Sequence, residues 1–298
     1  MPTYSEFLAS KNKAVEPCGF DALILSAHLY PFQRDIVRWA LRLGRAAIFA
    51  DTGLGKTVMQ LEWALRIVTT IGHGARVLIL APLSVAQQTA REAAKFGIAG
   101  AEYCRDDSAK HRIAIANYEM LYKFDPSEFN GIVLDESSIL KSFDGATRTR
   151  IIEAFAHTPF RLACTATPAP NDYMELGNHA EFLGIMTRAE MLAMYFVHDG
   201  ATTSQWRLKG HAEDFFWKWI CSWAVMIRKP SDLGHDDGKF ILPPLRIEQH
   251  SLPVDHETVR KAGFLFAMQA ETLNERRDTR RASTDARVAK CAGLVNAN

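Results

Sequence analysis

Residues 46–57 constrain the fold of this chain more than any other part of the sequence. The apolar run Ala46-Ala47-Ile48-Phe49 is typical of a short buried strand, and it leads into Ala50-Asp51-Thr52-Gly53-Leu54-Gly55-Lys56-Thr57. A helical pattern follows, with apolar residues at Leu61, Ala64, Leu65 and Val68. A strand, a glycine-rich loop and Gly-Lys-Thr at a helix start form the order of a P-loop. In a P-loop, backbone N–H groups and the helix N-terminus face a phosphate.

The residues of this loop have separate expected tasks. Lys56 is expected to reach the β- and γ-phosphates of a nucleotide, and the Thr57 hydroxyl to bind Mg²⁺. The predicted ATP-binding residues of the loop are Thr52, Gly53, Leu54, Gly55, Lys56 and Thr57. Ala50 stands where the general pattern has its first glycine, so the strict motif is not met. The alternative is a glycine-rich turn that binds no phosphate.

The segment from about 44 to 168 alternates short apolar runs with helical patterns. Strands are predicted at 46–49, 76–80, 113–116, 131–134 and 161–164, and helices at 85–96 and 147–155. Ser84 is the expected N-cap of the first of these helices, and Gly97 its end. Continuous apolar strands separated by helices indicate an α/β fold with a parallel sheet covered by helices on both faces. Ligands of such sheets bind at the carboxyl ends of the strands.

Composition limits where this chain works and what it binds. Lys and Arg total 35 against 34 for Asp and Glu, a net charge of +1, so any nucleic-acid surface must be local. The 5 cysteines are widely separated, which favours thiols of a reducing compartment over disulfides or a zinc site. The N-terminus does not resemble a signal peptide. No apolar stretch approaches the roughly 20 residues that span a bilayer, so we expect a soluble, cytoplasmic protein with no membrane partner.

Two further motifs close predicted strands. In Leu134-Asp135-Glu136, Asp135 is expected to hold Mg²⁺ and Glu136 to orient and deprotonate the attacking water. Lys56, Asp135 and Glu136 are therefore the predicted catalytic residues. Thr165-Ala166-Thr167-Pro168 ends the strand at 161–164, and its hydroxyls suit a nucleotide sensor, although an ordinary strand-to-loop turn is the alternative.

Gln33 lies shortly before the strand that leads into the loop. A glutamine side chain offers one acceptor and two donors, which suits the edge of adenine. Its place ahead of the loop makes Gln33 a candidate for reading the base of ATP.

The rest of the chain has a different pattern. Residues 187–227 are predicted to be helical and rich in aromatic residues, and Phe216, Trp219 or Ile220, and Trp223 recur at helical spacing. These form either a buried helix face or a platform for stacking bases. Proline and glycine between 230 and 244 mark a loop. The tail 255–298 is predicted to be helical, and its run Arg276–Arg281 faces either solvent or phosphates.

Six motifs in a fixed order give this chain a family resemblance. The motifs are Gln33, Ala50–Thr57, Ala81-Pro82-Leu83-Ser84, Asn117-Tyr118-Glu119-Met120-Leu121, Asp135-Glu136-Ser137-Ser138 and Thr165–Pro168. In this order they resemble superfamily 2 helicases, most closely the Swi/Snf-related members of phage and bacterial type. The resemblance implies a RecA-like lobe that binds ATP and Mg²⁺ in the cytoplasm of a bacterial or phage-infected cell.

The same resemblance implies a nucleic-acid partner, with duplex DNA favoured. Two segments would touch its sugar-phosphate backbone, namely Pro82, Leu83 and Ser84, and Asn117 with Tyr118. It also divides the chain into an N-terminal segment (1–24), an ATP-binding lobe (25–185), a helical extension (186–235), and a linker with a helical approach to a second lobe (236–298).

Two departures from the family pattern concern coupling and completeness. Ser138 stands where many relatives carry His or Asp, so the expected coupling set is Ser138, Thr165 and Thr167. The motif Gln-x-x-Gly-Arg-x-x-Arg of a second lobe does not occur in these 298 residues. An arginine of this kind contributes on the order of 10³–10⁵ in rate to related enzymes. We therefore expect this chain alone to bind nucleotide but to hydrolyse it weakly.

Three hypotheses follow from the sequence. The favoured one is the first lobe of an ATP-dependent DNA helicase or translocase that couples hydrolysis to nucleic-acid binding. The second is a nucleotide-gated binding module without turnover of its own, which needs a second lobe or another subunit to supply the arginines. The third is an unrelated P-loop enzyme such as a small-molecule kinase.

Overall fold

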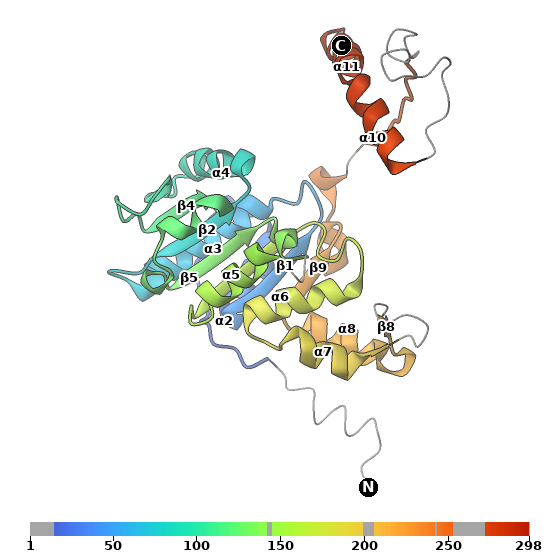
Figure 1. Ribbon diagram of the computed structural model, residues 1–298. Helices are drawn as coiled ribbons and strands as arrows, with labels where there is room; N and C mark the ends of the chain where they lie inside the picture. The colour runs from blue at the N-terminus through green and yellow to red at the C-terminus, as the bar shows by residue number, and fades with distance from the viewer. Residues whose placement is uncertain (1–14, 142–144, 199–205, 242, 253–271, 298) are drawn as a thin grey trace. The chain divides into compact units, whose positions relative to one another are not determined.

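The computed structural model describes residues 15–141, 145–198, 206–241, 243–252 and 272–297. The chain divides into two compact units, Met1–Ile241 and Leu242–Asn298, and each is described by itself. Figure 1 shows the elements of both units.

The first unit is built on a parallel seven-stranded sheet in the order β3-β4-β2-β5-β6-β1-β9. Its strands are β1 (Arg45–Ala50), β2 (Val77–Ala81), β3 (Ala101–Tyr103), β4 (Ile113–Asn117), β5 (Gly131–Asp135), β6 (Phe160–Thr165) and β9 (Ala224–Ile227). The five predicted strands are confirmed as β1, β2, β4, β5 and β6. The sequence pattern missed β3 and β9, which form the two edges of the sheet.

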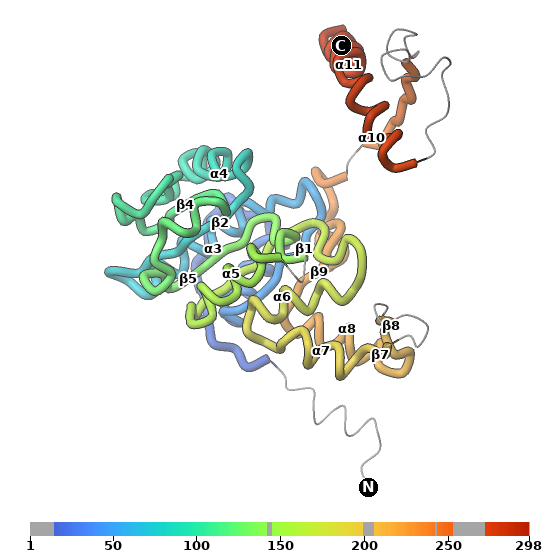
Figure 2. Tube along the Cα trace, in the orientation of Figure 1, coloured from blue at the N-terminus to red at the C-terminus, as the bar shows by residue number. Residues whose placement is uncertain are grey.

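Helices cover both faces of this sheet, as predicted (Figure 2). Successive strand residues point to opposite faces, so Ile48 packs in one core cluster and Phe49 in the other. On the Ile48 side lie α2 (Pro31–Leu43), α3 (Lys56–Ile71) and α4 (Leu83–Lys95). On the Phe49 side lie α5 (Ala146–Ala154), α6 (Leu176–Leu183), α7 (Arg188–Tyr195) and α8 (Glu213–Cys221).

The segment 187–227 is not wholly helical, contrary to the prediction. It contains an antiparallel hairpin of β7 (Phe196–His198) and β8 (Trp206–Leu208), and it ends in β9, which pairs with β1. The aromatic residues singled out at helical spacing are buried: Phe216 and Trp223 are 0% exposed and Trp219 is 3% exposed. A buried face is therefore the correct reading of this spacing.

Short 3₁₀ helices occur in several of the loops that connect these elements. They are η1 (Tyr118–Lys123), η2 (Pro126–Glu128), η3 (Ser137–Lys141), η4 (Tyr173–Glu175), η5 (Gly210–Ala212), η6 (Pro230–Leu233) and η7 (Gly238–Phe240). The predicted N-cap of α4 is wrong. This helix begins at Leu83 with Pro82 as its cap, because proline has no N–H to lose at a helix start and its fixed φ suits that position.

In the second unit, the described part of the tail is helical, as predicted. It contains α10 (Leu273–Ala282) and α11 (Thr284–Asn296). The side chain of Thr272 accepts from the backbone N–H of Glu275, and Glu275 closes a reciprocal capping box. The predicted helix over 255–271 lies outside the described residues. Among the described residues of both units, no helix has the length and apolar character to cross a membrane.

Candidate nucleotide and nucleic-acid sites

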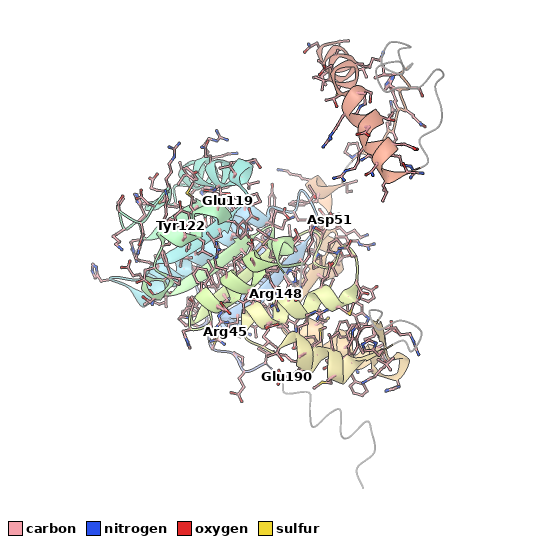
Figure 3. All side chains as sticks on the ribbon, in the orientation of Figure 1. Arg45, Asp51, Glu119, Tyr122, Arg148 and Glu190 are labelled. Atoms are coloured by element: carbon pink, nitrogen blue, oxygen red, sulfur yellow. The ribbon has the colours of Figure 1, made fainter. Side chains whose placement is uncertain are left out.

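The predicted site motifs come together at one edge of the parallel sheet. Asp51 and Glu119 follow β1 and β4 at this edge, and Figure 3 shows Arg45 at the other end of β1. Because all strands run the same way, their carboxyl ends meet here. The loop after β1, the acidic pair after β5 and the threonines after β6 therefore share one edge.

The loop after β1 has a backbone that only glycine adopts easily. Gly53 has a φ of 88° and Gly55 a φ of 78°, both in the left-handed region. At Gly55 a Cβ atom would lie 2.4 Å from Nε2 of Gln33, so there is also no room for a side chain. A Cβ on Gly53 would meet nothing within 4 Å. The loop is thus packed at Gly55 and open at Gly53.

Lys56 begins α3, and its ammonium group lies against the loop. The Nζ atom donates to the carbonyl oxygen of Ala50 at 2.9 Å and to that of Asp51 at 3.3 Å. These are neutral acceptors, and a phosphate would be a stronger one. The lysine is therefore positioned at the mouth of the loop by contacts that a phosphate can replace.

Gln33 holds the loop to α2. Its Nε2 atom donates to the carbonyl oxygen of Leu54 at 2.9 Å, and its Oε1 atom accepts from the N–H of Tyr30 at 2.9 Å. The residue is 2% exposed. That Gln33 reads adenine stays a prediction; what its contacts show is a clamp between the start of α2 and the P-loop.

Asp135 closes β5 in a buried, hydrogen-bonded position. It is 4% exposed, and its Oδ1 atom accepts from Nε2 of Gln60 at 2.7 Å and from the N–H of Glu136 at 3.1 Å. Burial raises the pKa of Asp135, and the hydrogen bond from Gln60 opposes that rise. Tyr118 donates its hydroxyl to the Asp135 carbonyl oxygen at 2.7 Å. Side chain and backbone of Asp135 are thus both held by neighbouring elements.

Glu136 has an unusual backbone for a residue with a side chain. Its φ is 53°, a left-handed conformation that costs roughly 1–3 kcal/mol and persists where the surroundings enforce it. The Thr165 hydroxyl donates to Oε2 of Glu136 at 3.2 Å, and the Thr167 N–H donates to the Thr165 hydroxyl at 3.1 Å. The threonine motif therefore contacts the acidic motif through Glu136.

The role of Ser138 in this coupling stays a prediction. Within the described residues, no hydrogen bond joins Ser138 to Thr165 or Thr167. The serine before it, Ser137, lies instead 3.1 Å through its Oγ atom from Nε2 of His179 on α6. Both of these residues are 0% exposed, and burial lowers the pKa of His179 to about 4, so its ring is neutral.

The two predicted nucleic-acid segments differ from one another. Pro82 caps α4, Ser84 is exposed and Leu83 is 60% exposed, so this segment offers a surface. In contrast, Asn117 is 2% and Tyr118 8% exposed. Asn117 donates to Glu119 and Tyr118 to the Asp135 carbonyl oxygen, so a contact between this segment and a nucleic-acid backbone stays a prediction.

The residues at this edge fit a nucleotide with Mg²⁺. Thr57 and Asp135 offer oxygen ligands, which Mg²⁺ prefers, and Lys56 stands beside the open side of the loop. In the described part of the chain, Oδ2 of Asp135 has no hydrogen-bond partner, and this oxygen is available for a metal-bound water. No group of three or more His, Cys, Asp or Glu with metal-site geometry occurs among the described residues.

Two residues of this site were missed from the sequence. Gln60 lies on α3 one turn after Lys56 and is 0% exposed. A single glutamine inside the apolar face of a helix was the available signal, because a buried amide needs a partner. His179 lies in α6, more than 40 residues after the acidic motif, and nothing near it in the sequence points to Ser137.

Comparisons with known proteins agree with this arrangement. Residues 30–176 match the family model of the DEAD/DEAH box helicase. The curated "Putative protein p41" of Acyrthosiphon pisum secondary endosymbiont phage 1 is 31% identical over 199 residues, which cover 59% of this chain and 42% of that protein.

Among solved structures, the SWI2/SNF2 ATPase core of Sulfolobus solfataricus in complex with dsDNA has a similar fold. The TM-score is 0.57 at 19% identity, over 72% of this chain and 47% of that one. This chain therefore spans less than half the length of each of these two proteins.

Proposed function

Since residues 30–176 form a DEAD/DEAH box helicase domain of superfamily 2, we propose that this chain is the ATP-binding motor lobe of a DNA helicase or translocase. The observation that carries the proposal is the contact between the helix of the P-loop and the acidic strand end. Gln60 of α3 donates to Asp135 at 2.7 Å, so the phosphate loop and the acidic pair form one site.

The residues divide the chemistry between binding and activation. Lys56 would bind the β- and γ-phosphates, while Thr57 and Asp135 would hold Mg²⁺. The metal, when bound, neutralises charge on the phosphates. Glu136 would orient the attacking water and accept its proton, and the Thr165 hydroxyl fixes the Glu136 carboxylate at 3.2 Å. Gln33 is proposed to contact adenine.

The partner we propose is duplex DNA. Support comes from the fold shared with a SWI2/SNF2 core that was solved with dsDNA. Pro82, Leu83 and Ser84 are proposed as its contact on this lobe, because they are accessible at the same edge as the ATP site. The similarity to a phage protein supports a place in a bacterial or phage-infected cell.

A second function is favoured by one feature of the sequence. The two-arginine motif is absent from these 298 residues, so the chain would act as a nucleotide-gated binding module until another lobe or subunit supplies arginines. Both functions share the same nucleotide site, and they differ in turnover. ATP hydrolysis by the 298-residue chain, with and without DNA, separates them.

Lys56→Ala tests the nucleotide site directly. We expect MgATP affinity to fall by roughly 100-fold or more, because each charge-assisted hydrogen bond contributes about 1.5–3 kcal/mol. Lys95→Ala is the control, since Lys95 is an exposed lysine at the end of α4. Calorimetric titration with MgATP measures both. Equal affinity in the wild-type chain and Lys56→Ala would contradict the proposal.

A further inference from the structure

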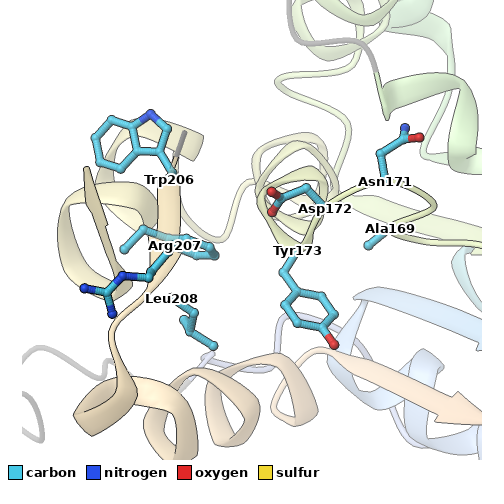
Figure 4. A pocket seen from close by; sticks show the side chains of 8 residues that line it. Ala169, Asn171, Asp172, Tyr173, Trp206, Arg207 and Leu208 are labelled. Carbon is cyan, nitrogen blue, oxygen red and sulfur yellow. The ribbon is translucent and has the colours of Figure 1, made fainter. Parts of the chain in front are cut away.

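A pocket lies between the loop after the threonine motif and the β7–β8 hairpin, and none of the functions above uses it. Its volume is about 460 Å³, within the range of roughly 300–1,000 Å³ that small-molecule sites have. Figure 4 shows Asp172 and Tyr173 on one wall and Trp206 and Leu208 on the other. The two walls come from segments more than 20 residues apart in the sequence.

The loop that forms the first wall is tied upstream to Glu136. The N–H of Thr167 donates to the Thr165 hydroxyl at 3.1 Å, and that hydroxyl donates to Oε2 of Glu136 at 3.2 Å. Ala169, two residues after Thr167, already lines the pocket. A shift of this wall therefore acts on the hydrogen bond that holds the proposed catalytic base.

The same loop is tied downstream to the residue after Glu136. Asn171 donates from Nδ2 to Oε1 of Glu175 at 2.7 Å, and the Glu175 carbonyl oxygen lies 3.4 Å from Nδ1 of His179. Because the ring of His179 is neutral, Nδ1–H donates to that carbonyl and Nε2 accepts from the Ser137 hydroxyl at 3.1 Å. Both ends of the wall thus lead to the acidic motif.

The chemistry of the walls suits a flat aromatic ligand with an acidic backbone. Tyr173 is 50% exposed and Trp206 is half-buried, so each has ring surface left for a ligand. Phe196 closes the hairpin side at 3% exposure. In Figure 4 the Asp172 carboxylate points toward the hairpin, where it can accept from the amino group of a base. Arg207 also lines the pocket and is exposed, so its guanidinium is accessible to a phosphate.

We propose that this pocket holds a base that has left its partner in the DNA duplex, and that a bound base shifts loop 167–175 and so repositions Glu136. The inference rests on the proposed function and adds the place at which a nucleic acid acts on the ATP site. Bases stack on aromatic side chains whatever their sequence, because every base has a π-face. A pocket of this kind therefore senses the presence of a base and not its identity.

The test compares two single-stranded DNA probes of equal length, one with bases and one built of abasic residues. We expect the wild-type chain to bind the strand with bases roughly 5- to 150-fold more tightly, the range for stacking one base. Tyr173→Leu and Trp206→Leu, one from each wall, should lose most of this preference and keep their affinity for the abasic strand. Tyr122→Leu is the control, since Tyr122 is 71% exposed and lies outside the pocket.

A second measurement tests the connection to Glu136. The strand with bases should change the MgATP affinity of the wild-type chain about 5-fold or more, a usual size for coupling between two sites. Ser137→Ala should bind the strand with wild-type affinity. In this variant the fold-change in MgATP affinity that the strand causes should fall toward 1. Unfolding curves of each variant confirm that it is folded.

The outcomes separate the two proposals. A wild-type chain that binds MgATP but binds both strands equally overturns the pocket and leaves the proposed function in place. If the wild-type chain and Tyr173→Leu prefer the strand with bases to the same extent, the pocket is likewise overturned and the proposed function stays in place. A chain that binds neither MgATP nor DNA contradicts both. A base preference with intact coupling in Ser137→Ala overturns the downstream connection through His179.

Discussion

The acidic end of β5 and the start of α4 lie at the same edge of the sheet, yet their side chains are held in opposite ways. Three neighbouring side chains hold the acidic pair by hydrogen bonds: Gln60 and Tyr118 fix Asp135, and Thr165 fixes Glu136. At α4, Leu83 is 60% exposed and Ser84 is exposed.

This difference separates two kinds of binding surface. A group that acts on a small reacting centre must be oriented in advance, because misplacement of about 1 Å costs on the order of 100-fold in rate. A surface that contacts a polymer backbone needs only to be accessible. The buried strand end should therefore be sensitive to single substitutions, and the exposed helix start should tolerate them.

The largest expected effect is on turnover in Glu136→Gln. Glutamine keeps the shape but cannot accept a proton, so DNA-stimulated ATP hydrolysis should fall roughly 10²- to 10⁴-fold. MgATP binding should stay within a few-fold of wild type. Steady-state hydrolysis and equilibrium binding, measured on the same preparation with any lobe that supplies arginines, check both parts. Unchanged hydrolysis would remove Glu136 from the catalytic site.

Acid should destabilise the strand end through His179. Its pKa in the folded chain is about 4, below the ordinary 6.5, so the unfolded chain binds a proton that the folded chain does not. The contribution of His179 to the free energy of unfolding is complete above pH 6.5. It is lost as the pH falls toward 4, by about 3 kcal/mol in total. Urea unfolding between pH 7.5 and 4.5 measures the loss. His179→Gln should flatten this dependence, whereas His157→Gln, at an exposed site, should not.

Gln60→Leu should weaken the metal-dependent part of nucleotide binding. Outer partners of metal ligands contribute about 10- to 100-fold to metal affinity, because they orient the ligand. We expect the affinity for ATP in the presence of Mg²⁺ to fall by this factor. The affinity for ATP without Mg²⁺ should change little. Gln88→Leu on exposed α4 is the matched control. A loss that is equal with and without Mg²⁺ would assign Gln60 a structural role only.

The smallest effects are expected from two matched substitutions, one beside the acidic end of β5 and one at the start of α4. Tyr118→Phe removes the hydroxyl bound to Asp135 and should lower the free energy of unfolding by about 1 kcal/mol, with DNA affinity unchanged. Leu83→Ala should leave stability unchanged within about 0.5 kcal/mol and lower DNA affinity a few-fold. Chemical unfolding and DNA titration of both variants measure the pair. The reverse result would place the nucleic-acid contact at Tyr118.

The features predicted correctly from the sequence are those that residues close together in the chain specify. Gly53, Gly55 and Lys56 specify the loop within a few residues, and five apolar runs specify five strands. β3 has only three residues, and Glu102 interrupts its apolar pattern. β9 is the apolar run Ala224–Ile227, but it directly follows the aromatic residues at helical spacing, so it was assigned to the helical segment.

The parts that escaped prediction depend on contacts distant in the sequence. Gln60 meets Asp135 across 75 residues, and Ser137 meets His179 across 42. Ser138 was chosen from the family pattern, but the residue of the acidic motif that the Thr165 hydroxyl contacts is Glu136. Tyr118 was assigned to a nucleic-acid contact from the family pattern, and that pattern does not reveal that its side chain is buried in η1.

The close approach of Gln33 to Gly55 has a practical consequence for dividing this chain. The glycine-rich loop keeps its shape with the help of a side chain that stands 22 residues earlier and is itself fixed by the N–H of Tyr30. A fragment cut between α2 and β1 would contain every letter of the loop but not the clamp that shapes it. Any minimal nucleotide-binding piece made from this protein must therefore begin before Tyr30.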